Sequence, residues 1–181
     1  MNRQRITFDI ILVGGSGFIG TALTDLLLKN NETVASISRE AQRQRSGVKN
    51  LVLDVGDLPS LREAFPHGKN VFILIGQNSD TFNPDEELQN ITNLISVLNE
   101  NLPPKVFYFS SALVYGEREV SALESDTTHP IDAYSRFKCD AEEVLRANLY
   151  PDITLGILRL AIVYGNPRNR GFINFLMRRL F

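Results

Sequence analysis

Short apolar runs alternate along this chain with longer segments whose apolar residues recur every three or four positions. An unbroken apolar run is typical of a strand buried on both faces, and the longer period is typical of a helix with one buried face. Strands that alternate with helices in this way predict a parallel sheet covered by helices. The predicted strands are residues 8–13, 33–37, 50–54, 71–75, 106–110 and 153–160, and the predicted helices are residues 17–29, 60–65, 84–99, 133–147 and 172–180.

Residues that cap or end helices mark several of these boundaries. Pro84 stands where the long third helix begins, because proline is favoured in a first helical turn, and Pro103-Pro104 ends it. Ser60 is the predicted cap of the short second helix. A chain of 181 residues with 43% hydrophobic side chains has the size of one domain, so we expect a single domain over residues 1–181.

The composition argues against several classes of protein. Nineteen basic against 21 acidic side chains give a net charge of −2, whereas nucleic-acid-binding domains are usually strongly basic. No apolar run approaches the roughly 18 residues that a membrane span needs, and Asp9 interrupts an N-terminal stretch that imitates a signal peptide. The single cysteine, Cys139, favours a reducing, cytoplasmic setting. His67 and His129 lie far apart, and no cluster has metal-ligand spacing, so we expect no metal site.

A glycine-rich segment joins the first predicted strand to the first predicted helix, and it fits both the GxGxxG and the GxxGxxG spacing. Glycines at these positions permit a tight turn, let a pyrophosphate approach the backbone, and let the helix pack on the strand. The helix N-terminus then offers N–H groups and a partial positive charge to phosphate. This context predicts a Rossmann-type doubly wound parallel β-sheet with helices on both faces. The expected cofactor contacts in this segment are Gly14, Gly15, Ser16, Gly17, Phe18, Ile19 and Gly20.

The end of the second strand indicates which dinucleotide is preferred. NAD-binding sites usually place an acidic residue there to hold the ribose hydroxyls. This chain instead has Ser38-Arg39, followed by Arg43 and Arg45, and a guanidinium at Arg39 suits a 2′-phosphate. We therefore expect NADP(H) to be preferred, with NAD(H) as the alternative cofactor, and a solvated basic loop as the plainer explanation of the arginines.

Asp54-Val55, at the end of the third strand, is a further predicted cofactor contact. A carboxylate there is placed to accept a hydrogen bond from the adenine amino group while Val55 lies against the ring. A turn or helix-capping aspartate explains the same residues equally well.

A second group of polar residues has the spacing of a catalytic site. Tyr134 and Lys138 are four positions apart in a predicted helix, which places both on one helix face. Ser110-Ser111 ends the fifth strand, at the edge where parallel sheets bind ligands. A Tyr-x-x-x-Lys pair is common by itself, and a packed tyrosine beside a solvated lysine is its usual explanation.

Taken together, four segments of the chain resemble the extended branch of the short-chain dehydrogenase/reductase family, the NAD-dependent epimerase/dehydratase type. They occur in the family's order and span nearly the whole chain. The segments are GGSGFIG at residues 14–20, SSALVYG at 110–116, YSRFK at 134–138 and LRLAIVYG at 158–165.

The resemblance implies a role for each residue of the second group. Tyr134 would be the general acid/base that exchanges a proton with a hydroxyl or carbonyl while hydride moves to or from the nicotinamide. Lys138 would stabilise the tyrosinate and hydrogen-bond the nicotinamide ribose, so both residues are also expected cofactor contacts. Ser111 aligns with the family's catalytic serine and would polarise the reacting oxygen. Because strand residues alternate between faces, only one of Ser110 and Ser111 should point into the cleft.

The chain also departs from the family pattern. Besides lacking the acidic residue on the second strand, it has Gly76-Gln77 where relatives often carry a small-residue signature, and we keep Gly76 as an expected cofactor contact. Relatives continue past the point that corresponds to Phe181 into a region that forms much of the sugar-nucleotide pocket. The resemblance thus implies that this domain is the N-terminal part of a longer protein. Apolar residues within 172–177 favour association, which leaves a homodimer open.

The leading hypothesis is an NAD(P)-dependent oxidoreductase or epimerase that acts on a small-molecule substrate resembling a nucleotide sugar. Epimerisation, dehydration and reduction begin with the same step, although Ala112-Leu113 stands where a dehydratase would carry an Asp-Glu pair, which disfavours dehydration. One alternative is a non-catalytic NADP(H)-binding module that senses redox state or acts as a scaffold. Another is that this polypeptide binds the cofactor but is inactive alone.

Overall fold

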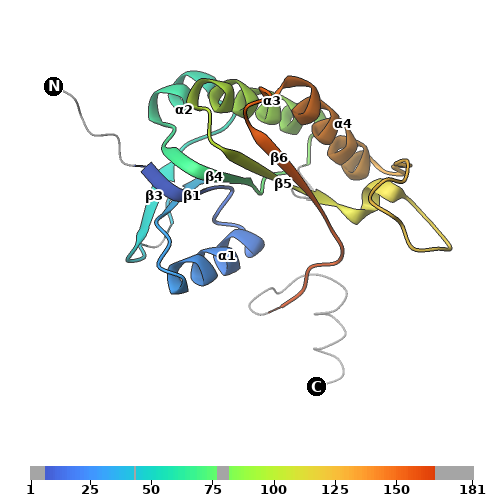
Figure 1. Ribbon diagram of the computed structural model, residues 1–181, viewed down its shortest axis with the longest axis horizontal. Coiled ribbons are helices and arrows are strands. Elements are labelled where there is room, and N and C mark those ends of the chain that lie inside the picture. The colour runs from blue at the N-terminus through green and yellow to red at the C-terminus, as the bar shows by residue number, and fades with distance from the viewer. Residues whose placement is uncertain (1–6, 43, 77–81, 166–181) are drawn as a thin grey trace.

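The computed structural model of the chain describes residues 7–42, 44–76 and 82–165. The elements are β1 (Thr7–Val13), α1 (Phe18–Lys29), β2 (Val34–Ser38), β3 (Val48–Val52), α2 (Leu58–Ala64), β4 (His67–Ile73), α3 (Pro84–Asn101), β5 (Lys105–Ser111), the 3₁₀ helix η1 (Ala112–Tyr115), α4 (Ala133–Asn148) and β6 (Thr154–Leu160). Figure 1 shows the chain coloured from its N-terminus to its C-terminus, and strands alternate with helices except that β3 follows β2 directly.

The six strands form one parallel sheet in the order β3-β2-β1-β4-β5-β6. The chain builds one half of the sheet outward from β1 and then returns to the centre to build the other half outward from β4. The halves meet where Val13 of β1 is in register with Ile73 of β4. Ligands of doubly wound sheets bind at this switch point, beyond the carboxyl ends of the strands.

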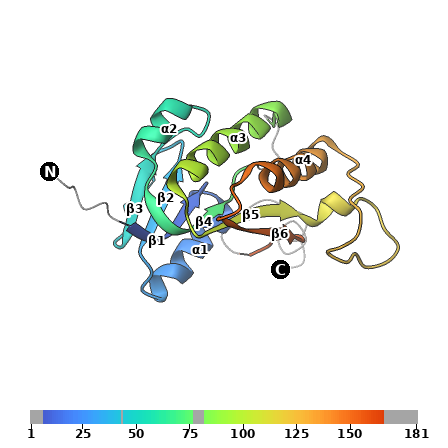
Figure 2. The same cartoon turned by 45° about the horizontal axis from the view of Figure 1, so that its top comes forward.

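Helices cover both faces of the sheet, which confirms the predicted fold class. In Figures 1 and 2, α1 lies on one face, and α2, α3 and α4 lie together on the other. Side chains alternate accordingly along β1, since Ile10 and Leu12 belong to a small core on the α1 side. Ile11 and Val13 belong to the larger core under the other three helices.

Two boundaries differ from the sequence-based expectation, and each has a local cause. Helix α2 is capped by Asp57, whose carboxylate accepts from the backbone N–H of Ser60, so Ser60 is the capped residue and not the cap. Strand β4 begins at His67, four residues before the apolar run. Its polar first half is satisfied by β1, because Lys69 Nζ donates to Asp9 Oδ1 at 2.6 Å and Asn70 Nδ2 donates to the Asp9 carbonyl at 3.0 Å.

The remaining expected elements agree with the structure to within one or two residues, apart from the helix expected over 172–180, which lies outside the described residues. Within the described ranges, no helix is both long enough and apolar enough to cross a membrane.

Candidate active site

The glycine turn lies at the centre of the sheet and is fixed to β2. The N–H groups of Gly14 and Gly15 both donate to the Ile37 carbonyl, at 2.9 and 3.3 Å. A Cβ atom on Gly20 would lie 2.6 Å from the Gly15 backbone, so helix and turn touch in a way that only glycine permits. The N-cap of α1 is Gly17, and no side chain from the described residues caps this helix end. Backbone N–H groups at the start of α1 therefore face the switch point.

Beyond β2, a polar network fills the place where the sequence lacks a carboxylate. Gln42 Nε2 donates to Ser38 Oγ at 2.7 Å and to Ser36 Oγ at 3.1 Å. Of the predicted arginine run, Arg39 is exposed, whereas Arg45 is paired with Asp25 at 2.6 Å. Arg43 lies outside the described residues. Of the two described arginines in this run, Arg39 is therefore the one that faces solvent, and Arg45 is the one paired with Asp25.

The two residues expected against adenine have other contacts in this structure. Asp54 is exposed, and its Oδ1 accepts from the Gly56 N–H at 2.9 Å, as in a turn. Val55 is 7% exposed and packs in the larger core, so little of this side chain is open to a ring.

Helix α4 carries both Tyr134 and Lys138 toward the carboxyl ends of β4 and β5. Asp132 and Ser135 form a capping box at its start, which fixes the first turn. Lys138 is only 2% exposed. Its Nζ donates to the carbonyls of Ile75 at 3.2 Å and Phe109 at 3.0 Å, and lies 5.6 Å from the centre of the Tyr134 ring. The spacing therefore does place the phenol and the ammonium on one helix face.

The two side chains titrate in opposite directions from their usual ranges. Burial lowers the pKa of Lys138 to about 7, and the nearby negative charges of Glu87 and Glu142 only partly oppose this. Burial, helped by the charge of Asp132, raises the pKa of Tyr134. Burial, with a smaller contribution from Asp132, thus favours the protonated form of Tyr134 at neutral pH.

Gly76 lies where α4 crosses the end of β4. Its φ of +80° is in the left-handed region, and a Cβ there would lie 2.5 Å from the Phe137 ring and 3.3 Å from Lys138 Nζ. Any side chain at this position would collide with the Phe137 ring and crowd the lysine, which gives the residue a packing reason independent of cofactor contact.

The neighbouring serines face opposite sides of β5, as strand alternation requires. Ser110 Oγ donates to Glu142 Oε1 of α4 at 2.6 Å and is buried. Ser111 Oγ accepts from the Leu113 N–H at 3.2 Å and caps η1. Ser110 is thus bonded to helix α4, whereas Ser111, which is also buried at 8% exposure, is the last residue of β5 at the carboxyl edge of the sheet.

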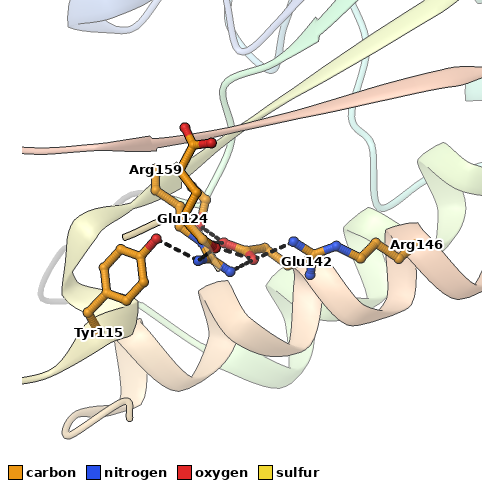
Figure 3. Close-up of polar contacts among 6 residues, drawn as sticks. Tyr115, Glu124, Glu142, Arg146 and Arg159 are labelled. Atoms are coloured by element: carbon orange, nitrogen blue, oxygen red, sulfur yellow. Dashed lines mark hydrogen bonds and ion pairs between the residues drawn. The ribbon is translucent and has the colours of Figure 1, made fainter. Parts of the chain in front are cut away.

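Figure 3 shows a buried ionic network around Glu142, which was not predicted from the sequence. Glu142 is 1% exposed, and Arg159 of β6 donates to both of its oxygens, with the shortest contact from Nη2 to Oε2 at 2.7 Å. Arg159 Nη1 also donates to Tyr115 Oη at 2.7 Å, and Arg146 donates to Glu142 at 3.1 Å. Burial raises the pKa of Glu142, but the hydrogen bonds from Arg159 and Ser110 outweigh it and the net shift is downward.

One signal in the sequence points to this network. Glu142 is four residues after Lys138, so it shares the buried face of α4. A cavity of about 440 Å³ adjoins the network from outside, lined by Thr128, Cys139, Glu143 and Ala147 together with the three charged residues. Among the described residues, no group of three or more His, Cys, Asp or Glu side chains is arranged to hold a metal ion.

Comparison with known protein families shows which family the chain belongs to. Residues 10–180 match the NAD dependent epimerase/dehydratase family, a span that includes nearly the whole chain. The chain belongs to this family.

Known proteins named as epimerases resemble the chain over most of its length. It is 26% identical over 183 residues to the N-acetyl-alpha-D-glucosaminyl-diphospho-ditrans,octacis-undecaprenol 4-epimerase of Escherichia coli O157:H7, which covers 95% of this chain and 54% of the relative. It is 26% identical over 189 residues to UDP-glucuronate 4-epimerase 3 of Arabidopsis thaliana, covering 90% of this chain and 44% of the relative. The chain therefore spans about half the length of these two family members.

A solved structure of the Bordetella bronchiseptica enzyme WbmG, in complex with NAD and UDP, has the same fold. The TM-score is 0.81 at 23% sequence identity, over 97% of this chain and 60% of WbmG. The chain thus shares its six-stranded parallel sheet with a structure that was solved with NAD bound.

Proposed function

We propose that residues 1–181 are the N-terminal, dinucleotide-binding part of an epimerase, and that this part carries the catalytic residues. The observation that carries the proposal is Lys138. It is a buried ammonium held by the Ile75 and Phe109 carbonyls beside the Tyr134 phenol, at the carboxyl ends of β4 and β5, next to the switch point of the sheet. A lysine placed there only for stability would be costly, because burial disfavours its charged form.

The residues around the switch point suit a dinucleotide. The contact of Gly20 with the Gly15 backbone and the open start of α1 suit a pyrophosphate, which needs close backbone approach and N–H donors. When bound, the nicotinamide accepts and returns a hydride. Tyr134 and Lys138 would lie against its ribose end, beside Gly76. The remaining proposed contacts are Gly14, Ser16, Gly17, Phe18, Ile19, Ser38, Arg39, Asp54 and Val55.

Tyr134 would move the proton of a substrate hydroxyl or carbonyl, with Ser111 donating to the same oxygen. Bringing a phenol from a pKa of ~10 to neutrality takes about 4 kcal/mol of stabilisation of its anion. Burial and Asp132 act in the wrong direction here. The Lys138 charge, reinforced by a cationic nicotinamide, has to supply the difference.

The substrate we infer is a sugar joined to a diphosphate. UDP-glucuronate and an undecaprenyl-diphosphate-linked sugar appear in the names of two relatives, both 4-epimerases, and a diphosphate sugar is what these substrates share. Ala112-Leu113 stands where a dehydratase would carry an acidic pair, so epimerisation is favoured over dehydration.

Tyr134→Phe in the full-length protein tests the catalytic assignment. Turnover should fall by at least about 10²-fold, the contribution typical of a general acid/base, while the Kd for the dinucleotide changes little. Tyr150→Phe is the control, because Tyr150 is exposed at 54% and lies outside the proposed site. Unchanged turnover in Tyr134→Phe rejects the assignment, and cofactor binding without any turnover in the parent protein supports a sensing or scaffolding module instead.

We also propose that the protein prefers NADP(H), although WbmG was solved with NAD. Support comes from the exposed Arg39 and from the hydroxyl and amide groups that replace a carboxylate at the end of β2. Titration of both cofactors should give a lower Kd for NADP(H), and Arg39→Gln should remove the difference. Arg45→Gln is the matched control, since Arg45 is paired with Asp25. A lower Kd for NAD(H) in the parent protein overturns the preference.

A further inference from the structure

The Lys138 ammonium is buried without a carboxylate at ion-pair distance among the described residues. Two backbone carbonyls accept its hydrogen bonds, and three aromatic rings surround it. Nζ lies 4.8 Å from the centre of the Tyr108 ring, 5.3 Å from that of Phe137 and 5.6 Å from that of Tyr134. A cation within about 6 Å of a ring face is attracted by the negative face of the ring, and more strongly so where water is excluded.

Tyr108 is the nearest of these rings. It lies in β5 under α3 and α4, is fully buried, and is part of the larger core. Its hydroxyl has no hydrogen-bond partner among the described residues. A buried phenol usually finds a partner, and leaving one without a partner is unfavourable. A hydrogen bond of the hydroxyl therefore does not explain why an aromatic residue lies at position 108. The contact of its ring with the Lys138 ammonium does.

Two carboxylates act on Lys138 without pairing with it. Glu87 faces it from α3 and Glu142 from α4, and neither forms an ion pair with it. Among the described residues, Tyr108 and Tyr134 are the titratable side chains whose rings face the ammonium, and Cys139 follows Lys138 on the same helix. Substitution of the ring is therefore a way to change the electrostatic environment of Lys138 without removing a formal charge.

We infer that Tyr108 is a positioning residue. Its ring favours the charged form of Lys138 and fixes the position of the ammonium through a cation–π contact, where no ion pair is present among the described residues. The part of this inference that concerns cofactor binding rests on the proposed function of Lys138. The part that concerns the lysine itself does not.

The test replaces Tyr108 by phenylalanine and by phenylalanines carrying one, two and three ring fluorines. Fluorine withdraws electrons from the ring face while the shape of the side chain barely changes, so folding is preserved across the series. The measurement is the pKa of Lys138, from NMR titration of ¹³C-labelled lysine side chains, with its signal assigned by Lys138→Arg. The pKa should fall stepwise with fluorination, by roughly 0.5 to 1 unit in total.

The matched control is the same series at Phe107, one residue earlier in β5. Phe107 points to the opposite face of the sheet, where it stacks on Phe72 with ring centres 4.9 Å apart. Fluorination there should leave the Lys138 pKa unchanged. A Lys138 pKa that does not respond to fluorination at position 108, or that responds equally at position 107, overturns the inference.

Dinucleotide affinity of the same variants separates the two proposals. If Lys138 binds the cofactor as proposed, affinity at pH 7 should fall with its pKa, by up to about 5-fold over the series, since less of the lysine is charged. A Lys138 pKa that falls while affinity stays constant would leave the role of Tyr108 standing and reject that of Lys138 in cofactor binding.

Discussion

Lys138 makes the protein less stable at low pH than a neutral side chain would. Its pKa is about 7 in the folded chain, against an ordinary value of 10.5. Between these values the unfolded chain binds more protons, so the free energy of unfolding rises with pH from about 7 to 10.5. Lys138→Met should therefore stabilise the protein on the order of 5 kcal/mol at pH 6, and the gain should shrink as the pH approaches 10.5.

Urea unfolding of parent and variant across this pH range checks the prediction. Lys105→Met is the control, because Lys105 is exposed and its substitution removes no buried amine. A stability difference for Lys138→Met that stays constant from pH 6 to 10.5 would mean that the lysine is not desolvated in the folded protein.

At the residue scale, the sequence could predict which side chains meet but not how deeply they are buried. A spacing of four in a helix was enough to place Tyr134 beside Lys138. Burial was not foreseeable in the same way, because lysines usually stay in water and a Tyr-x-x-x-Lys pair is expected on a wet helix face. Tyr108 carried no signal either, since an aromatic residue in a strand is an ordinary core residue.

At the scale of elements, the Glu142 network connects α4, β5, β6 and η1. Glu142→Leu leaves the Arg159 guanidinium without its partner, and its side chain is only 15% exposed. We expect a loss of about 3–5 kcal/mol in the free energy of unfolding. The double variant Glu142→Leu/Arg159→Leu should lose less than Glu142→Leu alone, because no unpaired charge is then left inside.

The exposed pair Arg62–Glu100 is the matched control for this cycle. It also joins two elements, α2 and α3, at 2.8 Å, but both side chains are close to half exposed. Removing Glu100 should cost less than about 1 kcal/mol. Equal losses at the buried and exposed pairs would show that burial does not determine the strength of the Glu142 network.

Element boundaries were predictable where a residue type forces them. Pro84 and Pro103-Pro104 bracket α3 in the structure as in the sequence, because proline lacks the N–H that a helix interior needs. The start of β4 was missed because its polar residues look like loop, and their partner Asp9 is 60 residues away. Contacts of that kind have no local signature.

At the scale of the molecule, the alternation of elements predicted a parallel sheet, and the glycine turn predicted where its ligand edge lies. The pattern could not predict the unequal cores of the two faces. On the face of the sheet that α1 covers, the core is small and consists of Ile10, Leu12 and Val34 with the residues packed around them. On the other face, α2, α3 and α4 share the larger core. That division depends on which side of the sheet each connection passes.

The order of the strands makes the candidate site part of the most protected region of the molecule. Strand β1 lies between β2 and β4 and is buried at Ile11 and Leu12, whereas β3 pairs only with β2 among the described strands and is half exposed. Hydrogen exchange should therefore be slowest in β1 and β4, which open only with the whole domain, and faster in β3. Dinucleotide at 100 times its Kd should slow exchange in β1 and β4 by about 100-fold, because binding adds about 2.7 kcal/mol to the global opening. Exchange as slow in β3 as in β1, or cofactor protection confined to β3, would place either the stable centre or the binding edge elsewhere in the sheet.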